Sequence, residues 1–457
     1  MRNCLKKMLL LLSALSIFPV HAATLAIIDS GTDMLHKDIF NKAWVNPVEI
    51  PGNDRDEDHN GYQDDINGWN FAEGNNQLID YKYLPLLTFD VRKFFEIQGK
   101  SLLGTVTDAE RAWMRAKFED QEFVKNLQTY GNFMHGTHVA GISARDADEA
   151  KVLAVKLIPT EVKLPIPTPD ADEDDSNLDG GDLGIGLLKA GLTQLAKQQM
   201  KLLVEIGEYV GNHKADVANG SFGTGYPQSR MIVEALFKGI MRRDATEEEA
   251  HMLAVHFITT LVQEGAHMVA AAPDTLFVFA AGNDGLDNDK FPTSPTNIKA
   301  SNVLSVAATL NFGELAVFSN YGKKMVDVAA PGVAIKSSVP GNEYLQVSGT
   351  SQAAPYVTNL AGRIKDVNKD LGVSEIKKII METVDKREEL KEKVLSSGIV
   401  NTDRALRAAA LSLELPLARA LSQARVDVGD QAHLKAFSPL ANKSAEFVLP
   451  LPSGFSF

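Results

Sequence analysis

The sequence predicts an α/β protein built on a mostly parallel β-sheet, with helices covering both faces. The first observation is that short, strongly apolar runs end in turns that contain glycine or asparagine, as buried strands do. The second is that longer segments with apolar residues at three- and four-residue spacing lie between these runs, which is the periodicity of helices. The chain has 457 residues, 44% of them apolar, and can therefore bury a large core.

The first predicted strand is Leu25–Ile28, an apolar run that stops at Asp29-Ser30-Gly31. Functional groups in open α/β sheets lie at the carboxyl ends of strands, so Asp29 falls where such a sheet places its chemistry. Five later segments combine an apolar run with a turn in a similar way: 152–157, 216–223, 275–285, 302–310 and 325–332.

Helical spacing extends over residues 183–210 and 228–266, and again through the segment that begins at Ser351. Residues 80–130 share this spacing and carry mixed charge, which predicts a helical insertion. Residues 160–183 are rich in Pro, Asp and Gly and predict an exposed loop.

Residues 1–22 have the composition of a secretory signal peptide. Arg2, Lys6 and Lys7 precede a compact apolar run, and small residues end the segment at Ala22, as a cleavage site requires. The alternative is a membrane anchor. We favour the signal peptide because the run is short for a bilayer span and no second candidate span follows.

The charge balance narrows the class of partner. The formal net charge is −13, and removal of residues 1–22 would take away three positive charges and change it to −16. Such a charge favours solubility and argues against nucleic acid or an anionic membrane as a partner. The same removal would take away Cys4, the only cysteine, so the exported fold would be held together without disulfides.

Three motifs carry the groups of a nucleophilic hydrolase. They are LAIIDSGTD with Asp29, HGTHVAGI with His135, and SGTSQAAPYV with Ser351. A serine hydroxyl is a poor nucleophile at neutral pH; it needs a base within hydrogen-bond reach, and the base needs an acid that orients it. Taken singly, the three residues also fit a strand-end cap, a core histidine and a turn serine. The chain order Asp, His, Ser separates this set from other serine hydrolases.

In this order the motifs resemble those of the subtilisin-like serine proteases (subtilases), and the resemblance covers roughly Thr24–Ala410 with insertions. It implies that Ser351 is the nucleophile, that His135 is the general base and then the general acid, and that Asp29 holds the imidazole in the correct tautomer. It also implies that the side-chain amide of Asn283 forms the oxyanion hole together with the Ser351 N–H. The alternative for Asn283 is an ordinary turn residue.

The resemblance also implies two walls of a substrate cleft. Ser221, Phe222 and Gly223 match the segment whose backbone pairs with an extended substrate and which lines the first specificity pocket. Ala281 and Gly282 would form the opposite wall. The alternative for both segments is an ordinary junction between a strand and a turn.

Two further positions lie inside the motifs. The resemblance implies a structural role for His138, the second histidine of HGTHVAG. Gln352 stands where relatives usually carry a methionine after the nucleophile, and we expect it to pack near the site with a modest effect.

An acidic loop is the best candidate for a metal site. Asp56, Asp58, Asn60 and Asp64 match the first, third, fifth and ninth positions of a calcium loop of the EF-hand kind, with Gly61 at the sixth. The bidentate glutamate of such loops is absent. Calcium is favoured over zinc because every candidate ligand is an oxygen. The alternative is a solvated acidic turn.

The predicted organisation is a signal peptide (1–22), a catalytic domain (23–410) and a C-terminal extension (411–457). The catalytic domain contains the helical insertion at about 80–130 and the acidic loop at about 160–183. Within the extension, the segment FVLPLPSGFSF fits either a strand or a loose tail.

The predicted function is that of an exported serine endopeptidase, secreted or periplasmic, that cleaves polypeptide substrates through an acyl-enzyme and holds structural calcium. The alternatives are a non-catalytic subtilase-like binding protein and a serine esterase or transpeptidase. Only six residues separate Ala22 from Asp29, so we expect no N-terminal propeptide between them. We expect the insertion at 80–130 to restrict the active site instead.

Overall fold

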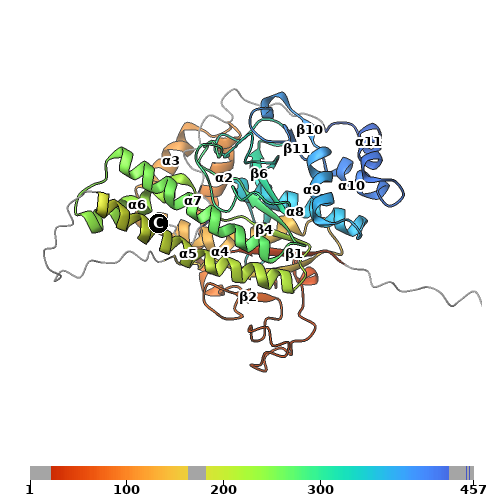
Figure 1. Ribbon diagram of the computed structural model, residues 1–457, viewed down its shortest axis with the longest axis horizontal. Helices are drawn as coiled ribbons and strands as arrows, with labels where there is room; N and C mark the ends of the chain where they lie inside the picture. Colours follow the sequence, from red (N-terminus) through yellow and green to blue (C-terminus); the bar gives the residue numbers. More distant parts are fainter. Residues whose placement is uncertain (1–21, 163–181, 432–448, 450–451, 453–457) are drawn as a thin grey trace, which may run out of the picture.

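The computed structural model describes residues 22–162, 182–431, 449 and 452. Most of the predicted signal peptide and of the predicted acidic loop at 160–183 lies outside these residues. Within the described part, nine strands form one sheet in the order β10-β11-β7-β6-β5-β4-β1-β3-β2 (Figure 1). Every neighbouring pair is parallel except β10 with β11. The predicted fold class is confirmed.

The strands of this sheet are β1 (Thr24–Asp29), β2 (Gly68–Asn70), β3 (Lys151–Lys156), β4 (Val217–Gly220), β5 (Leu276–Ala280), β6 (Val303–Thr309), β7 (Val328–Pro331), β10 (Asp385–Lys386) and β11 (Gly398–Ile399). All six strand segments predicted from apolar runs are present, and the short strands β2, β10 and β11 are additions. Short 3-10 helices occur at η1 (Phe40–Lys42), η2 (Tyr81–Leu86) and η3 (Glu388–Leu390).

β1 lies in the middle of the sheet, between β3 and β4, and is buried on both faces. Leu25 packs into one hydrophobic cluster, whereas Ala26 and Ile28 pack into another. A strand that is covered on both sides reads as a continuous apolar run, which is why this segment was recognisable in the sequence. Asp29 is its last residue.

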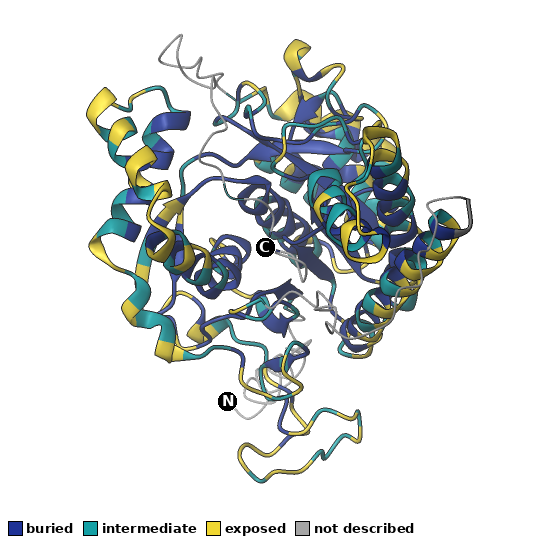
Figure 2. Ribbon diagram, turned by 90° about the vertical axis from the view of Figure 1, so that its left-hand side faces the viewer, coloured by how far each residue is buried: buried dark blue, intermediate teal, exposed yellow. Residues whose placement is uncertain are grey.

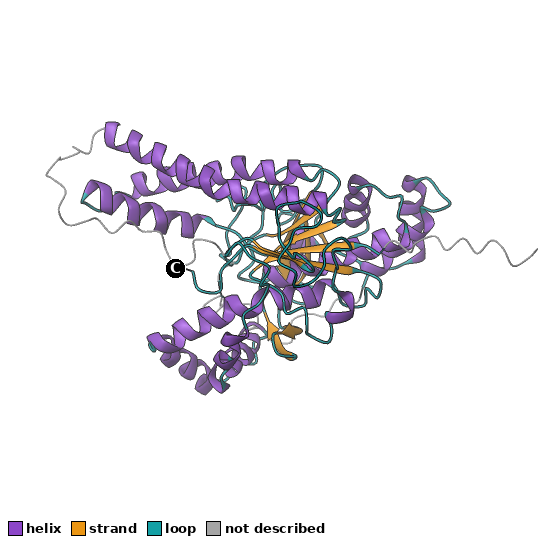
Figure 3. Cartoon of the chain, turned by 90° about the horizontal axis from the view of Figure 1, so that it is seen from below, coloured by secondary structure: helices purple, strands orange, loops and turns teal. Residues whose placement is uncertain are grey.

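Helices cover the two faces. The face of Leu25 is covered by α4 (Gln121–Ser143), α8 (Thr350–Val367), α9 (Val373–Glu382), α10 (Thr402–Leu411) and α11 (Leu417–Asp427). The face of Ala26 is covered by α5 (Asp182–Asn212), α6 (Tyr226–Met241) and α7 (Glu247–Ala271). The last three run side by side and extend beyond the strands (Figures 1 and 3). Buried residues gather in the sheet and on the helix surfaces that face it (Figure 2).

The helical segment predicted at 228–266 is two helices, α6 and α7. α6 ends at Met241, and Arg242, which caps it, has a φ of 52° in the left-handed region. α7 begins after Thr246, whose side chain accepts from the N–H of Glu249, while the Glu249 carboxylate accepts from the N–H of Thr246. This reciprocal capping box starts a new helix and was readable in the sequence as Thr-Glu-Glu-Glu.

The insertion at 80–130 is helical, as predicted. It contains α2 (Phe89–Leu102), α3 (Asp108–Phe118) and the first half of α4. Its aromatic side chains form a separate hydrophobic cluster that also includes Leu345 and Val347. These two residues belong to a hairpin of β8 (Ile335–Val339) and β9 (Glu343–Val347), which the sequence did not predict. α4 continues without a break from the insertion through His135.

The first part of the predicted C-terminal extension is folded onto the main core. Leu421 and Ala424 of α11 are buried in the same cluster as Leu25. No helix in the described parts of the chain combines the length and the apolar content needed to cross a bilayer.

Candidate active site

The carboxyl ends of three adjacent strands converge on one edge of the sheet. The order β5-β4-β1 places Asp29, at the end of β1, near Ser221, which follows β4, and near Ala281, which follows β5. Parallel strands end at the same edge, so residues far apart in sequence meet there. This edge gathers most of the residues that the sequence singled out.

His135 reaches Asp29 because α4 packs very closely on the turn after β1. A Cβ at Gly136 would lie 2.2 Å from the Gly31 carbonyl oxygen, so only glycine allows this approach. Nδ1 of His135 lies 2.7 Å from Oδ1 of Asp29. The Ser30 N–H also donates to Oδ1 of Asp29, at 2.7 Å. Asp29 is fully buried and His135 is 7% exposed.

Ser351 lies in the first turn of α8, where helix N–H groups lack intrahelical partners. Its hydroxyl donates to the Ser221 carbonyl at 3.3 Å, and the Ser221 hydroxyl donates to the Ser351 carbonyl at 3.1 Å. Ser351 and His135 line the same cavity of about 260 Å³. Within the described residues, no hydrogen bond joins the Ser351 hydroxyl to the His135 imidazole.

The Asn283 amide has a fixed orientation. Its Oδ1 accepts from the N–H of Thr350 at 2.9 Å and from the Thr350 hydroxyl at 2.8 Å. Because a backbone N–H can only donate, the amide oxygen must face Thr350 and Nδ2 must face the cavity. There Nδ2 donates to the Leu449 carbonyl at 3.0 Å. The sequence did not single out Thr350, although it stands inside the SGTS motif.

The two predicted walls have different surroundings. Gly223 donates its N–H to the Pro452 carbonyl at 2.9 Å. Phe222 and Gly223 line a second cavity of about 270 Å³. Ser221 holds Ser351 through the paired hydrogen bonds described above.

The other wall lies behind Asn283. Ala281 is fully buried, and its carbonyl accepts from the Asn288 side chain at 2.9 Å. Gly282 donates its N–H to the Thr350 hydroxyl at 3.1 Å and accepts from the N–H of Asn320 at 2.8 Å. Through the Thr350 hydroxyl, Gly282 is joined to the residue that orients Asn283. The role of Ala281 and Gly282 as a wall of the substrate cleft stays a prediction.

His138 is held as a neutral imidazole away from the reacting groups. Its Nε2 donates to the Leu345 carbonyl at 3.3 Å, and its Nδ1 accepts from the Gln352 amide at 3.5 Å. Burial lowers the pKa of His138 to about 3. Gln352 therefore packs beside the nucleophile, as expected, and also bonds to this buried histidine.

In the acidic loop, two of the predicted calcium ligands, Asp64 and Asn60, take part in the loop's own hydrogen bonds. Asp64 is buried and turns its carboxylate to the N–H groups of Gly52 and Asp54, both at 2.9 Å. Asn60 directs its amide at Asp58 and at Asp65, both at 3.1 Å. Asp64 is in neither of the two groups of described residues whose carboxylate or imidazole atoms could hold a metal ion together.

Two groups in the described residues have ligand atoms within 4.8 Å of one another, and both contain Asp58. The first consists of Glu49, Asp56 and Asp58, all oxygen donors. Burial raises the pKa of Asp56, but N–H groups from Gly61 and Asn60 outweigh it, and the net pKa is lowered. This carboxylate is therefore ionised and able to bind a cation.

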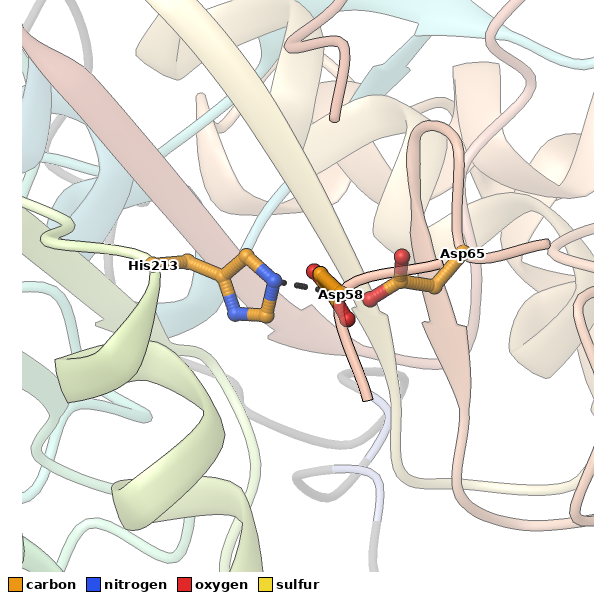
Figure 4. Close-up of side chains that lie close together, drawn as sticks. All are labelled: Asp58, Asp65 and His213. Atoms are coloured by element: carbon orange, nitrogen blue, oxygen red, sulfur yellow. Dashed lines mark ion pairs between the residues drawn. The ribbon is translucent and has the colours of Figure 1, made fainter. Parts of the chain in front are cut away.

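The second group consists of Asp58, Asp65 and His213 (Figure 4). Nδ1 of His213 donates to the Tyr209 carbonyl at 2.7 Å, and Nε2 faces Asp65 at 3.4 Å. Glu49, Asp65 and His213 were not among the metal ligands predicted from the sequence. Asp65 follows Asp64 in the acidic run, but nothing local in the sequence indicates His213, which lies just beyond α5.

Comparison with known families identifies the class of protein. A model described as the subtilase family matches residues 21–401. The chain belongs to the subtilase family of serine endopeptidases, which confirms the resemblance seen in the motifs.

Individual relatives are similar over part of their length. Subtilisin BL of Lederbergia lenta is 27% identical over 273 residues, which are 60% of this chain and 77% of that protein. Alkaline elastase YaB of Bacillus sp. (strain YaB) is 35% identical over 138 residues, which are 30% of this chain and 34% of that protein. An extracellular basic protease of Dichelobacter nodosus is 36% identical over 144 residues, 29% of this chain and 23% of that protein. The matched region thus spans about a third of the elastase and about a quarter of the basic protease.

Two solved structures are also similar. A cold adapted subtilisin-like serine proteinase is 17% identical, with a TM-score of 0.42, over 84% of this chain and 89% of that one. A lanthipeptide protease is 18% identical, with a TM-score of 0.45, over 84% of this chain and 86% of that one.

Proposed function

We propose that this protein is an exported serine endopeptidase that cleaves polypeptides through an acyl-enzyme intermediate. The observation that carries the proposal is the 2.7 Å contact between Asp29 and His135, with the imidazole opening onto the cavity that Ser351 and Asn283 also line. A buried acid, an imidazole and a hydroxyl at one cavity are the parts that acyl transfer needs.

The contact with Asp29 determines which nitrogen of the His135 imidazole carries the proton. Nδ1 of His135 donates to the carboxylate, which leaves a lone pair on Nε2 to act as the base. In the acylation step the Ser351 hydroxyl turns from the Ser221 carbonyl toward Nε2. Its oxygen bonds to the substrate carbonyl carbon while its proton moves to His135.

Two donors are available for the negative charge that develops on the substrate oxygen. They are Nδ2 of Asn283 and the N–H of Ser351 in the first turn of α8. The imidazolium then protonates the leaving amine as the C–N bond breaks. Water repeats the sequence on the Ser351 ester, with His135 as base, and releases the acid product.

A fluorophosphonate probe tests the nucleophile. It should label the wild type at Ser351 and fail on Ser351→Ala, whereas a non-catalytic binding protein would stay unlabelled in both. Asn283→Ala should lower turnover about 10²–10³-fold, the range found when a serine protease loses one oxyanion-hole donor. Comparison of peptide with ester substrates separates an endopeptidase from an esterase or transpeptidase.

Export and calcium complete the proposal. The signal-peptide pattern of residues 1–22 supports export, as does similarity to a protease named as extracellular. The oxygen-only group of Glu49, Asp56 and Asp58 fits calcium, which would stabilise the acidic loop and take no part in the reaction. Detection of the mature N-terminus outside the cytoplasm would test export.

A further inference from the structure

Leu449 and Pro452 lie in the active-site cavity, far along the chain from the sheet edge that forms it. Both residues line the cavity with His135 and Ser351, and Pro452 is buried. The sequence left their segment open between a strand and a loose tail. Leu449 and Pro452 each make a specific contact with the site.

The first contact is with the amide proposed for the oxyanion hole. Nδ2 of Asn283 donates to the Leu449 carbonyl at 3.0 Å, so a peptide carbonyl of this chain already occupies the donor that a substrate would need. The orientation of that amide is set independently, because its oxygen accepts from the backbone N–H of Thr350. Nδ2 must therefore be the amide atom that faces the Leu449 carbonyl.

The second contact is with the substrate-binding wall. The N–H of Gly223 donates to the Pro452 carbonyl at 2.9 Å, which is the kind of main-chain pairing that an extended peptide makes. A third contact is apolar. The Leu449 side chain packs on the hydrophobic cluster of the helical insertion, and its Cδ1 would lie 3.6 Å from a Cβ at Gly131, one turn before His135.

The order of these contacts gives the segment a direction. In a substrate, the residues that pair with the backbone of Ser221, Phe222 and Gly223 precede the residue whose carbonyl enters the oxyanion hole. Here the residue on that wall, Pro452, follows the residue at Asn283, Leu449. Leu449 and Pro452 therefore stand in the opposite chain order to a substrate, and we expect the bond after Leu449 to escape attack.

We propose that Leu449 and Pro452 act as an intramolecular inhibitor: they occupy the active-site cavity in the reverse chain order to a substrate and block peptide substrates. This inference rests on the proposed function, because it assigns the regulation of the same site. It also gives the insertion a role, since α4 and the cluster of α2 and β9 supply the surface on which Leu449 docks.

The main test uses Leu449→Asp in the full-length chain. A carboxylate at position 449 would face the apolar surface of the insertion and should displace the residue from it. The fraction of molecules with an open cleft then increases, and kcat/KM for a peptide substrate should rise about tenfold. The matched control is Leu413→Asp, because Leu413 is an exposed leucine, 60% accessible, outside the cavity. Equal kcat/KM for both variants and the wild type would overturn the proposal while leaving the endopeptidase function intact.

A second test does not depend on catalysis. In a Ser351→Ala background, a fluorescent peptide of residues 445–457 should bind the Leu449→Asp chain, whose cleft is open, and bind the parent chain at least about tenfold more weakly. A peptide carrying Leu449→Asp should bind neither. Equal binding to both chains would refute occlusion of the cleft, even if the catalytic proposal had failed.

Mass spectrometry of the active wild-type protein tests the direction of binding. The bond after Leu449 should remain intact through prolonged incubation, while an added peptide substrate is cleaved. Efficient cut sites after Leu449 would mean that the segment binds as a substrate, and the reverse direction would then be wrong.

Discussion

The backbone of Gly136 lies directly against that of Gly31, so that a Cβ at position 136 would fall 2.2 Å from the Gly31 carbonyl oxygen. Gly136→Ala must therefore push α4 away from the end of β1, and with it His135 from Asp29. We expect kcat/KM to fall by about 10²-fold or more, because a shift of about 1 Å in a catalytic group has that effect. Peptide turnover and fluorophosphonate labelling measure it.

The matched control is Gly239→Ala on α6, where a Cβ would meet no atom within 4 Å. That change should leave turnover unchanged and stabilise the protein by about 0.5–1 kcal/mol, because alanine loses less entropy in a helix. Wild-type activity in Gly136→Ala would show that the close approach is not needed for the Asp29–His135 contact.

Thr350 holds the proposed oxyanion amide in place. Thr350→Val removes the hydroxyl that donates to Asn283 Oδ1 at 2.8 Å and accepts from the N–H of Gly282 at 3.1 Å. We expect kcat to fall about tenfold with little change in KM, since the Asn283 amide loses one of the two hydrogen bonds that orient it, worth about 1 kcal/mol. Thr350→Ser should restore kcat. Equal kcat in the Val and Ser variants would contradict this positioning role.

His138 should make the protein sensitive to acid. Burial lowers the pKa of His138 to about 3 in the folded state, from its ordinary value of 6.5, so the unfolded chain binds an extra proton between these values. Stability is therefore complete above about pH 6.5 and falls as the pH is lowered, by up to about 1.4 kcal/mol per pH unit. Denaturant titrations of the wild type and His138→Gln should compare about pH 7.5 with about pH 4.5.

The wild type should lose about 2–3 kcal/mol more than His138→Gln across that interval, since only the wild type carries the buried imidazole. Other titrating groups are common to both proteins and cancel in the comparison. An identical pH dependence would mean that His138 is protonated in the fold or contributes nothing to acid unfolding.

Asp58 belongs to both groups that could hold a metal, whereas Asp64 belongs to neither. We expect added calcium to raise the melting temperature of the wild type and to have no effect on Asp58→Asn. At about 100 times its Kd, calcium would add about 2.7 kcal/mol of stability. Differential scanning calorimetry with calcium and with a chelator measures this difference.

Asp64→Asn serves as the comparison. It should lower stability, because its carboxylate accepts from the N–H groups of Gly52 and Asp54, but it should keep the calcium response. Loss of the calcium response in both variants would favour the EF-hand-like arrangement predicted from the sequence, which uses both carboxylates. A response kept in Asp58→Asn would contradict both arrangements.

The elements that sequence patterns predicted correctly depend on local features. β1 is a continuous apolar run because both of its faces are covered, and α8 follows the motif around Ser351 with a clear helical period. The hairpin of β8 and β9 escaped prediction because Ile335–Val339 reads IKSSV, with polar residues at its centre. Its strands are defined by pairing with each other and by the insertion packed against them.

The acidic loop shows the same difference between what local sequence features predict and what the folded structure decides. Spacing alone suggested Asp56, Asp58, Asn60 and Asp64, because calcium loops use alternate residues. Backbone N–H groups compete for the same carboxylates, and in the fold Asp64 is used to hold the loop's own amides. Which carboxylate stays available for an ion is decided by these local hydrogen bonds, and spacing does not reveal them.

The chain's own residues determine the fold class, the family and the chemical types at the active site, because apolar periodicity and short motifs are properties of neighbouring residues. The tertiary structure alone decided that Asp29 and His135 touch, that Thr350 fixes Asn283, and that the segment at Leu449 enters the cavity. These relationships join residues separated by a hundred positions or more, or by whole elements. They exist only once the parallel strands end at one edge and the helices pack upon them.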